Sequence, residues 1–220
     1  MSGYRLNLPA IEASLREVQR EFPRINALLH SRRDSMTDAV VQQMLAGYTF
    51  VDIAIRQQHD LFDMKNVNGL LELNHIVLCG LDPAVRKEHQ KHLEATEQRF
   101  YDQEGFDIGD ILMWHHTHAH ETPWKRAAGV YVRILSQPQL YIEGNHRTGA
   151  LIMSYLLARD GEPPFVLTVS NAKAYFDPST LIKQTKKTPS ALLAKLPHMK
   201  RRFATFLHDQ ANDRYLRQGD

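Results

Sequence analysis

Residues 139–151 read Gln-Leu-Tyr-Ile-Glu-Gly-Asn-His-Arg-Thr-Gly-Ala-Leu, and a helical pattern lies on either side of them. Upstream, residues 124–135 carry apolar side chains at helical spacing. Downstream, a second apolar stripe begins at residue 151 and ends before Gly161. Pro138 and the Gly144-Asn145 pair are typical of a turn. The sequence therefore predicts a tight loop between two helices.

The second of these helices is expected to begin at Asn145 or His146. Its first backbone N–H groups have no partner inside the helix and carry a partial positive charge, so they favour an anion. Arg147 adds a cation that can fork onto phosphate oxygens. Glu143 adds a carboxylate that suits a magnesium ion bridging to a phosphate. The pattern predicts a nucleotide-phosphate pocket. Its expected binding residues are Gly144, Asn145, His146, Arg147 and Thr148, with Glu143 as the metal ligand.

The order of these residues resembles the active-site loop of the Fic/Doc (Fido) family, whose pattern is His-x-Phe-x-Asp/Glu-Gly/Ala-Asn-x-Arg. Tyr141 stands where that family has its phenylalanine, and Glu143 stands at the metal-binding acid. Gly144, Asn145 and Arg147 match the turn and the phosphate-binding arginine. The resemblance covers roughly residues 40 to 165. It implies a transferase that uses ATP or another nucleotide with Mg²⁺; the family includes AMP transfer (AMPylation), phosphate transfer and phosphocholine transfer, and we place AMP transfer first.

Three positions depart from that pattern. The general-base histidine of the family falls on Gln139, whose amide hydrogen-bonds but cannot take a proton from a hydroxyl. Ala150 stands where many AMP-transferring members have a further arginine, and His146 replaces a small glycine. We count His146, Gln139 and Asn145 as the candidate catalytic residues. His146 is either a replacement base or a neighbour of the helix start with no chemical role.

The composition is that of an ordinary globular chain. The 220 residues are 43% hydrophobic and 24% charged, with a formal net charge of +2. Basic runs at 183–187 and 195–202 are typical of solvated helix faces, with nucleic-acid contact as the lesser alternative. The single cysteine, Cys79, allows no internal disulfide, which suits a reducing cytosol. The sequence shows neither a signal-peptide core nor an apolar run long enough to span a bilayer. We expect a cytoplasmic protein with no membrane partner.

The expected fold is all-α, or mainly α: a Fido-type helical bundle in one domain over residues 1–220. It has N-terminal helices over 9–60, a core over 70–160 with the loop at 139–150, and C-terminal helices over 170–209. Pro23 is expected to interrupt the first helix, Gly47 to break the second and Pro178 to close a short one. Residues 165–169 predict one short strand or hairpin, or else extended coil packed on the bundle. Residues after 209 are expected to fray.

The segment 114–121 contains a histidine cluster. His116, His118 and His120 alternate, so in an extended strand they would share one face. With Glu121 they would suit zinc or nickel. An ordinary histidine-rich surface loop is the simpler interpretation. Because the segment precedes the helix that leads into the loop, one of its imidazoles is also a rival to His146 as the replacement base.

These observations leave more than one function open. The first is a Fic-like transferase that moves a nucleotide-derived phosphate-containing group, AMP before others, to a protein hydroxyl. The alternative is a catalytically degenerate nucleotide-binding protein that regulates a partner, which Gln139 and Ala150 favour. A DNA-binding module ranks last, since it rests only on the late basic runs and on helix content. Whether the chain forms a homo-oligomer is left open.

Overall fold

The computed structural model describes residues 3–102 and 106–219, and their fold is mainly helical, which confirms the predicted class. In chain order the longer helices are as follows: α1 (Leu8–Ala27), α2 (Asp38–Arg56), α3 (Asn68–Cys79), α4 (Pro83–Glu88), α5 (Gln90–Asp102), α6 (Ile108–Thr117), α7 (Pro123–Leu135), α8 (Asn145–Arg159), α9 (Ala172–Gln184) and α10 (Leu196–Asp209). A π-helical segment (Ala191–Lys195) precedes α10, and a 3₁₀ turn (Asp213–Tyr215) follows it.

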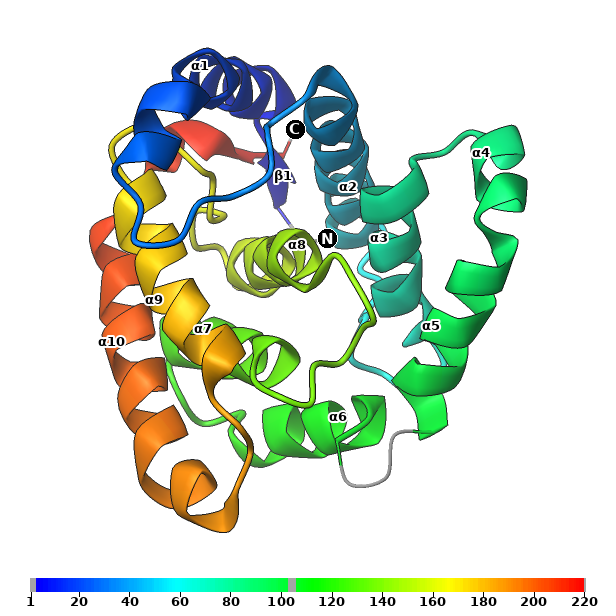
Figure 1. Cartoon of the computed structure of the whole chain (residues 1–220), viewed down its shortest axis with the longest axis vertical. Helices are drawn as coiled ribbons and strands as arrows, with labels where there is room; N and C mark the ends of the chain where they lie inside the picture. Colours follow the sequence, from blue (N-terminus) through cyan, green and yellow to red (C-terminus); the bar gives the residue numbers. More distant parts are fainter. Residues whose placement is uncertain (1–2, 103–105, 220) are drawn as a thin grey trace.

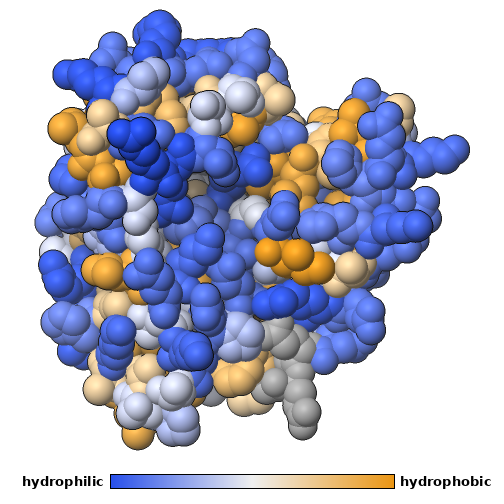
Figure 2. Space-filling model, viewed as in Figure 1, coloured by the Kyte–Doolittle hydropathy of each residue, from blue (hydrophilic) through white to orange (hydrophobic). Residues whose placement is uncertain are grey.

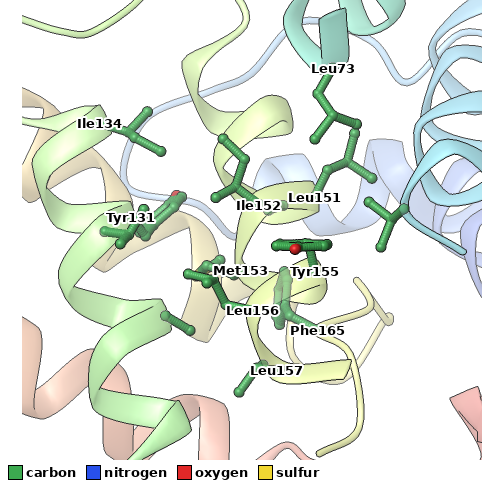
Figure 3. Packing of buried hydrophobic residues seen from close by; sticks show 14 of the residues in the cluster. Leu73, Tyr131, Ile134, Leu151, Ile152, Met153, Tyr155, Leu156, Leu157 and Phe165 are labelled. Atoms are coloured by element: carbon green, nitrogen blue, oxygen red, sulfur yellow. The ribbon is translucent and has the colours of Figure 1, made fainter. Parts of the chain in front are cut away.

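Helix α8 lies at the centre of the bundle, with α2 and α3 on one side of it and α7 on the other (Figure 1). It is central because residues 150–153 and 155–158 are apolar on every face, and a helix that is apolar all round must be buried. Figure 3 shows Leu151, Ile152 and Tyr155 leaving α8 in different directions. Leu151 points toward Leu73 of α3, and Ile152 lies on the side of Ile134 of α7. The loop that precedes α8 is thereby fixed to the core of the protein.

The helices around the loop begin and end close to where the sequence predicts. Helix α8 begins at Asn145 and α7 ends at Leu135. Helix α3 stops at Gly80, which has φ 71°, a backbone conformation that glycine adopts at little cost. Asp82 caps α4 by accepting a hydrogen bond from the Ala84 N–H at 2.8 Å.

The three expected helix breaks at Pro23, Gly47 and Pro178 are wrong. Helix α1 runs through Pro23 and α9 through Pro178. Proline removes one hydrogen bond from a helix, but the buried residues on both sides of each proline continue the stripe that packs on the core. Helix α2 runs through Gly47, where a Cβ atom would lie 2.3 Å from Leu151 Cδ1. Glycine there lets α2 and α8 approach closely.

The sheet also differs from the prediction. Residues 165–168 form neither a helix nor a strand, which is the coil alternative. The two strands are instead β1 (Tyr4–Leu6) and β2 (Leu216–Gln218), antiparallel, with Leu6 opposite Leu216. The expected fraying after residue 209 is therefore wrong, because Tyr215 is buried and the strand after it pairs with the N-terminal one.

One hydrophobic cluster runs from Leu6 to Tyr215, and a smaller one joins α1 to the start of α9. Seen from the side of Figure 1, the surface is mostly hydrophilic with scattered apolar patches, and it is hollowed near its centre (Figure 2). Among the described residues, no helix is both long enough and apolar enough to cross a membrane.

Candidate functional site

The loop between α7 and α8 is anchored at its entry and at its middle. At the entry, the Gln137 N–H donates to the Thr185 carbonyl at 2.8 Å, and the Lys187 N–H donates back to the Gln137 carbonyl at 2.7 Å. In the middle, the fully buried Tyr141 ring stacks on Phe100 at 5.6 Å. Tyr141 therefore occupies the core, as expected for the residue that pins the loop.

Asn145 closes the end of the loop. Its Oδ1 accepts a hydrogen bond from the Tyr141 N–H at 3.0 Å, and its Nδ2 donates to the Tyr141 carbonyl at 2.9 Å. The residue is 4% exposed. Both ends of the amide are therefore used inside the loop, and this geometry assigns Asn145 a positioning role.

Gly144 is the turn that directs the chain into α8. Its φ of 74° lies in the left-handed region, and a Cβ atom would lie 2.9 Å from Asn74 Nδ2. That Nδ2 donates to the Glu143 carbonyl and to Thr148 Oγ1, each at 3.0 Å. Thr148 is fully buried, so its side chain faces the core and not solvent. Asn74, on α3, is a loop-supporting residue for which the sequence carried no signal.

Arg147 is half-buried at the first turn of α8. Its Nη1 donates to the Val77 carbonyl at 2.8 Å and to Gln43 Oε1 at 3.0 Å. Burial lowers the pKa of Arg147, while the carboxylates of Glu143 and Asp34 oppose that shift. Among the described residues, these hydrogen bonds use Nη1 alone, so Nε and Nη2 remain able to bind an anion.

Glu143 is exposed, and the hydrogen bonds of the described residues leave its carboxylate without a partner. A magnesium ion commonly takes one or two carboxylates and completes its octahedron with water and phosphate oxygens. The Glu143 carboxylate has no hydrogen-bond partner among the described residues and lies next to the start of α8, where the backbone N–H groups favour an anion. It therefore fits this set of magnesium ligands. The described residues contain no cluster of three His, Cys, Asp or Glu side chains that could bind a metal without such a phosphate.

His146 is held on both ring nitrogens. Nε2 lies 3.1 Å from Arg33 Nη1, and Nδ1 lies 3.3 Å from the Tyr131 hydroxyl. Because an arginine only donates, Nε2 accepts and Nδ1 carries the hydrogen. Burial, with the nearby charges of Arg33 and Lys183, lowers the pKa of His146 to about 3. A side chain with so low a pKa is a weak proton acceptor near neutral pH.

Gln139 turns its side-chain amide back onto α7. Its Nε2 donates to the Leu135 carbonyl at 3.1 Å, which satisfies one of the open carbonyls at the end of that helix. Its own backbone carbonyl accepts two hydrogen bonds from Arg99, at 2.8 and 2.9 Å. The residue standing at the position of the motif histidine is thus a helix cap.

A cleft of about 540 Å³ lies beside Gln139 and contains an unexpected lysine. Lys187 is 6% exposed, and its Nζ donates to the Pro138 carbonyl at 2.8 Å. Burial is the main cause that lowers the pKa of Lys187 to about 8, and Arg133 and Arg99 add to it, while Asp110 opposes it. The sequence suggested only a solvated basic run here, because nothing local shows that residue 187 packs against residue 138.

A second cavity, of about 240 Å³, opens beside the first turn of α8. Its walls come mainly from apolar and aromatic side chains of α1, α2, α9 and the extended segment after α8. Its polar residues are Arg33, Asp34, Ser35, His146 and Arg147. In Figure 1 the segment between α1 and α2 passes close to the upper end of α9, and Arg33 on that segment contacts His146 of α8 and Thr180 of α9.

The histidine cluster is not extended. Helix α6 continues to Thr117, so His116 lies on a helix and the strand that would align the three histidines does not form, although the His118 and His120 rings stack at 6.3 Å. His115 is buried against Phe62, with ring centroids 4.3 Å apart, and His118 stacks on Trp114 at 4.2 Å. The cluster precedes the start of α7, whereas the loop follows its end, and a 13-residue helix is roughly 20 Å long. This separation weighs against a replacement base from the cluster.

Comparison with known proteins yields a single kind of likeness. No family model and no curated protein match the chain. Among solved structures, the chain is similar to a Fic domain-containing signalling protein from Bacteroides thetaiotaomicron. The two are 14% identical, the alignment covers 92% of this chain and 90% of that one, and the TM-score is 0.49. Function therefore has to be argued from the residues of this chain.

Proposed function

We propose that the chain binds a nucleotide by its phosphates at the start of α8 and transfers a phosphate-containing group from it, AMP first among the candidates, to a hydroxyl of a target protein. The observation that carries this proposal is the construction of the α8 start. Gly144 turns the chain, Asn145 braces the turn, and Arg147 stands at the first helical turn with donors left over. Such a helix start binds anions.

The division of roles follows from these contacts. The first amides of α8 and Arg147 hold the phosphate, and Glu143 would hold a magnesium ion. That ion, when bound, neutralises charge that develops on the phosphate oxygens. Asn145 and Tyr141 keep the loop in shape. Positioning and electrostatics dominate phosphoryl transfer, so these roles account for much of the chemistry.

The acceptor hydroxyl also needs a proton acceptor, and Lys187 is the group we assign to it. Gln139 cannot accept the proton, and His146 is a weak base. Lys187 lines the same cleft as Gln139 and binds the carbonyl of the residue before it. With a pKa of about 8, on the order of a tenth of its amines are neutral at pH 7.

A regulatory role without transfer is the second candidate, and one observation favours it. The Gln139 amide is used to cap α7, so no side chain at the motif position faces a reacting hydroxyl. In this case the same pocket binds a nucleotide and the bound state is read by a partner. The two candidates share the phosphate site and differ only in whether a group is transferred.

The phosphate site is tested by titrating ATP, CTP, GTP and UTP with magnesium into wild type and Arg147→Ala in a calorimeter. We expect one nucleotide to bind wild type and to bind the variant about 10- to 150-fold more weakly, the loss for one charge-assisted contact. Gln43→Ala, which removes a partner of Arg147 but no phosphate donor, is the control and should bind nearly normally. Equal binding by wild type and Arg147→Ala would place the phosphate elsewhere, and no binding at all would end both candidate functions.

The proton acceptor is tested by the pH dependence of transfer. A base must be neutral to act, and Lys187 is protonated below its pKa of about 8. Transfer, followed as incorporation of a radiolabelled nucleotide group into protein, should therefore rise about tenfold per pH unit up to pH ~8 and then level off. Lys187→Met should abolish the rise, whereas Lys186→Met, at an exposed neighbour on the same cleft, should keep it. An NMR titration of the lysine ε carbons measures the pKa of Lys187 without an activity assay. A midpoint for Lys187 at the solvated value of ~10.4 would rule out Lys187 as the proton acceptor.

A further inference from the structure

The cavity beside α8 is lined mainly by apolar side chains, together with two arginines. Leu15, Phe22, Met44 and Phe165 are among the buried side chains of its wall. Arg33 and Arg147 belong to the same lining, with Asp34 as the opposing charge. A site of this kind matches a ligand with an anionic head and a hydrocarbon body.

The phenol hydroxyls of the cavity wall are already used as hydrogen-bond donors. Of its two phenol hydroxyls, that of Tyr48 donates to the Phe165 carbonyl at 2.7 Å and that of Tyr175 donates to the His146 carbonyl at 3.0 Å. A nucleobase packed against the apolar part of this wall would lose hydrogen bonds with water that the apolar side chains cannot replace, which is costly. A hydrocarbon group has no such loss.

The side chain at position 150 also limits the charged groups that the cavity can accommodate. It is 5% exposed, lies one helical turn after His146 and contributes a methyl group to the wall. Among the described residues that line the cavity, Arg33 and Arg147 are the only arginines or lysines, so a second or third phosphate would find no further such cation there. The polyphosphate tail of a nucleoside triphosphate would be buried there without a counter-charge.

An unpaired donor marks where the head would bind. Arg33 donates through Nη2 to Thr180 Oγ1 at 2.7 Å and lies with Nη1 against His146. Its Nε is buried, yet it has no hydrogen-bond partner among the described residues. Buried donors are seldom left unpaired in proteins, so this atom calls for an acceptor supplied by a ligand.

We propose that the cavity takes the hydrocarbon group of a phosphate ester whose phosphate binds between Arg33, Arg147 and the first turn of α8. This inference rests on the phosphate site of the proposed function and names its ligand class. The donor is a phosphate or pyrophosphate ester with an apolar substituent, and the nucleoside of a nucleotide donor lies outside the cavity.

The test is a calorimetric series with the full chain, using inorganic phosphate and then ethyl, butyl, hexyl and octyl phosphate. Each methylene buried in the cavity should tighten binding about fourfold until the cavity is full, after which affinity should level off. Ala150→Leu, which fills the cavity, should move that plateau to shorter esters. Val40→Ala, which enlarges it at a partly exposed position of the lining, should move the plateau to longer ones. Leu193→Ala, at a side chain that is 84% exposed, should change nothing.

Two results would overturn the inference: affinities that do not depend on chain length, or a plateau that neither cavity variant moves. Should Ala150→Leu fail to fold, Val40→Ala still decides. Sedimentation with vesicles that contain phosphatidic acid would identify a membrane lipid as the source of the ester, whereas octyl phosphate binding without sedimentation would identify a free one. Nucleotide binding without a chain-length effect removes this inference alone, and a chain-length effect without nucleotide binding removes the proposed function instead.

Discussion

Tyr141→Ala is expected to lower the free energy of unfolding by about 3–5 kcal/mol, the usual cost of deleting a buried aromatic ring. The ring is fully buried and stacks on Phe100, and its hydroxyl donates to the Leu70 carbonyl at 2.9 Å. The variant should also lose phosphate binding, because Asn145 holds the turn before α8 through the backbone of residue 141, and that backbone is fixed to the core by the Tyr141 ring. Urea unfolding and nucleotide titration measure the two effects.

Tyr141→Phe separates the ring from the hydroxyl. It keeps the packing on Phe100 and removes one hydrogen bond to Leu70, so it should cost only about 1 kcal/mol and leave phosphate binding nearly intact. If Tyr141→Ala were no more destabilising than Tyr141→Phe, the ring would not be what holds the loop in place.

The helices that flank the loop could be predicted because their signals are local. Apolar residues recur at helical spacing in α7 and α8, and the turn between these helices contains the glycine that its backbone requires. Gly144 needs a left-handed backbone, and Asn145 bonds to a residue only four positions away. Information carried within a few residues is available to a sequence pattern.

The helix breaks were mispredicted because packing overrides local preference. Gly47 weakens α2 by about 1 kcal/mol as an isolated residue, yet its missing side chain makes room for Leu151 of α8. The same holds for the termini of the chain. The N–H of Leu6 donates to Asp52 Oδ1 at 2.7 Å and its strand pairs with residues 216–218, and neither partner is visible in a local window.

The environment of the site depends on contacts between distant segments in the same way. Arg33 reaches His146 across 113 positions, and Lys187 reaches Pro138 across 49. The sequence named His146 as a candidate base, but the neighbours that lower its pKa come from α9 and from the segment before α2. Residue identities could therefore indicate a phosphate site, whereas the strength of each base and the shape of the cavity follow only from the fold.

Asn145→Ala is expected to cost about 2–4 kcal/mol of unfolding free energy and to weaken nucleotide binding more than tenfold. The amide satisfies both the N–H and the carbonyl of Tyr141 in a buried place, and each group left unpaired costs roughly 1–3 kcal/mol. The turn would relax to recover those hydrogen bonds, and the first amides of α8 would no longer converge on the phosphate.

Asn171→Ala is the matched control, because Asn171 is as buried as Asn145 and supports a turn in the same manner. Its Oδ1 accepts from the Thr168 N–H, and its Nδ2 donates to the Val166 carbonyl. It should destabilise the protein by a similar amount while retaining nucleotide binding. If both variants lost binding in proportion to stability, the effect of Asn145 would be on folding alone, and the turn before α8 would have no special part in holding the phosphate.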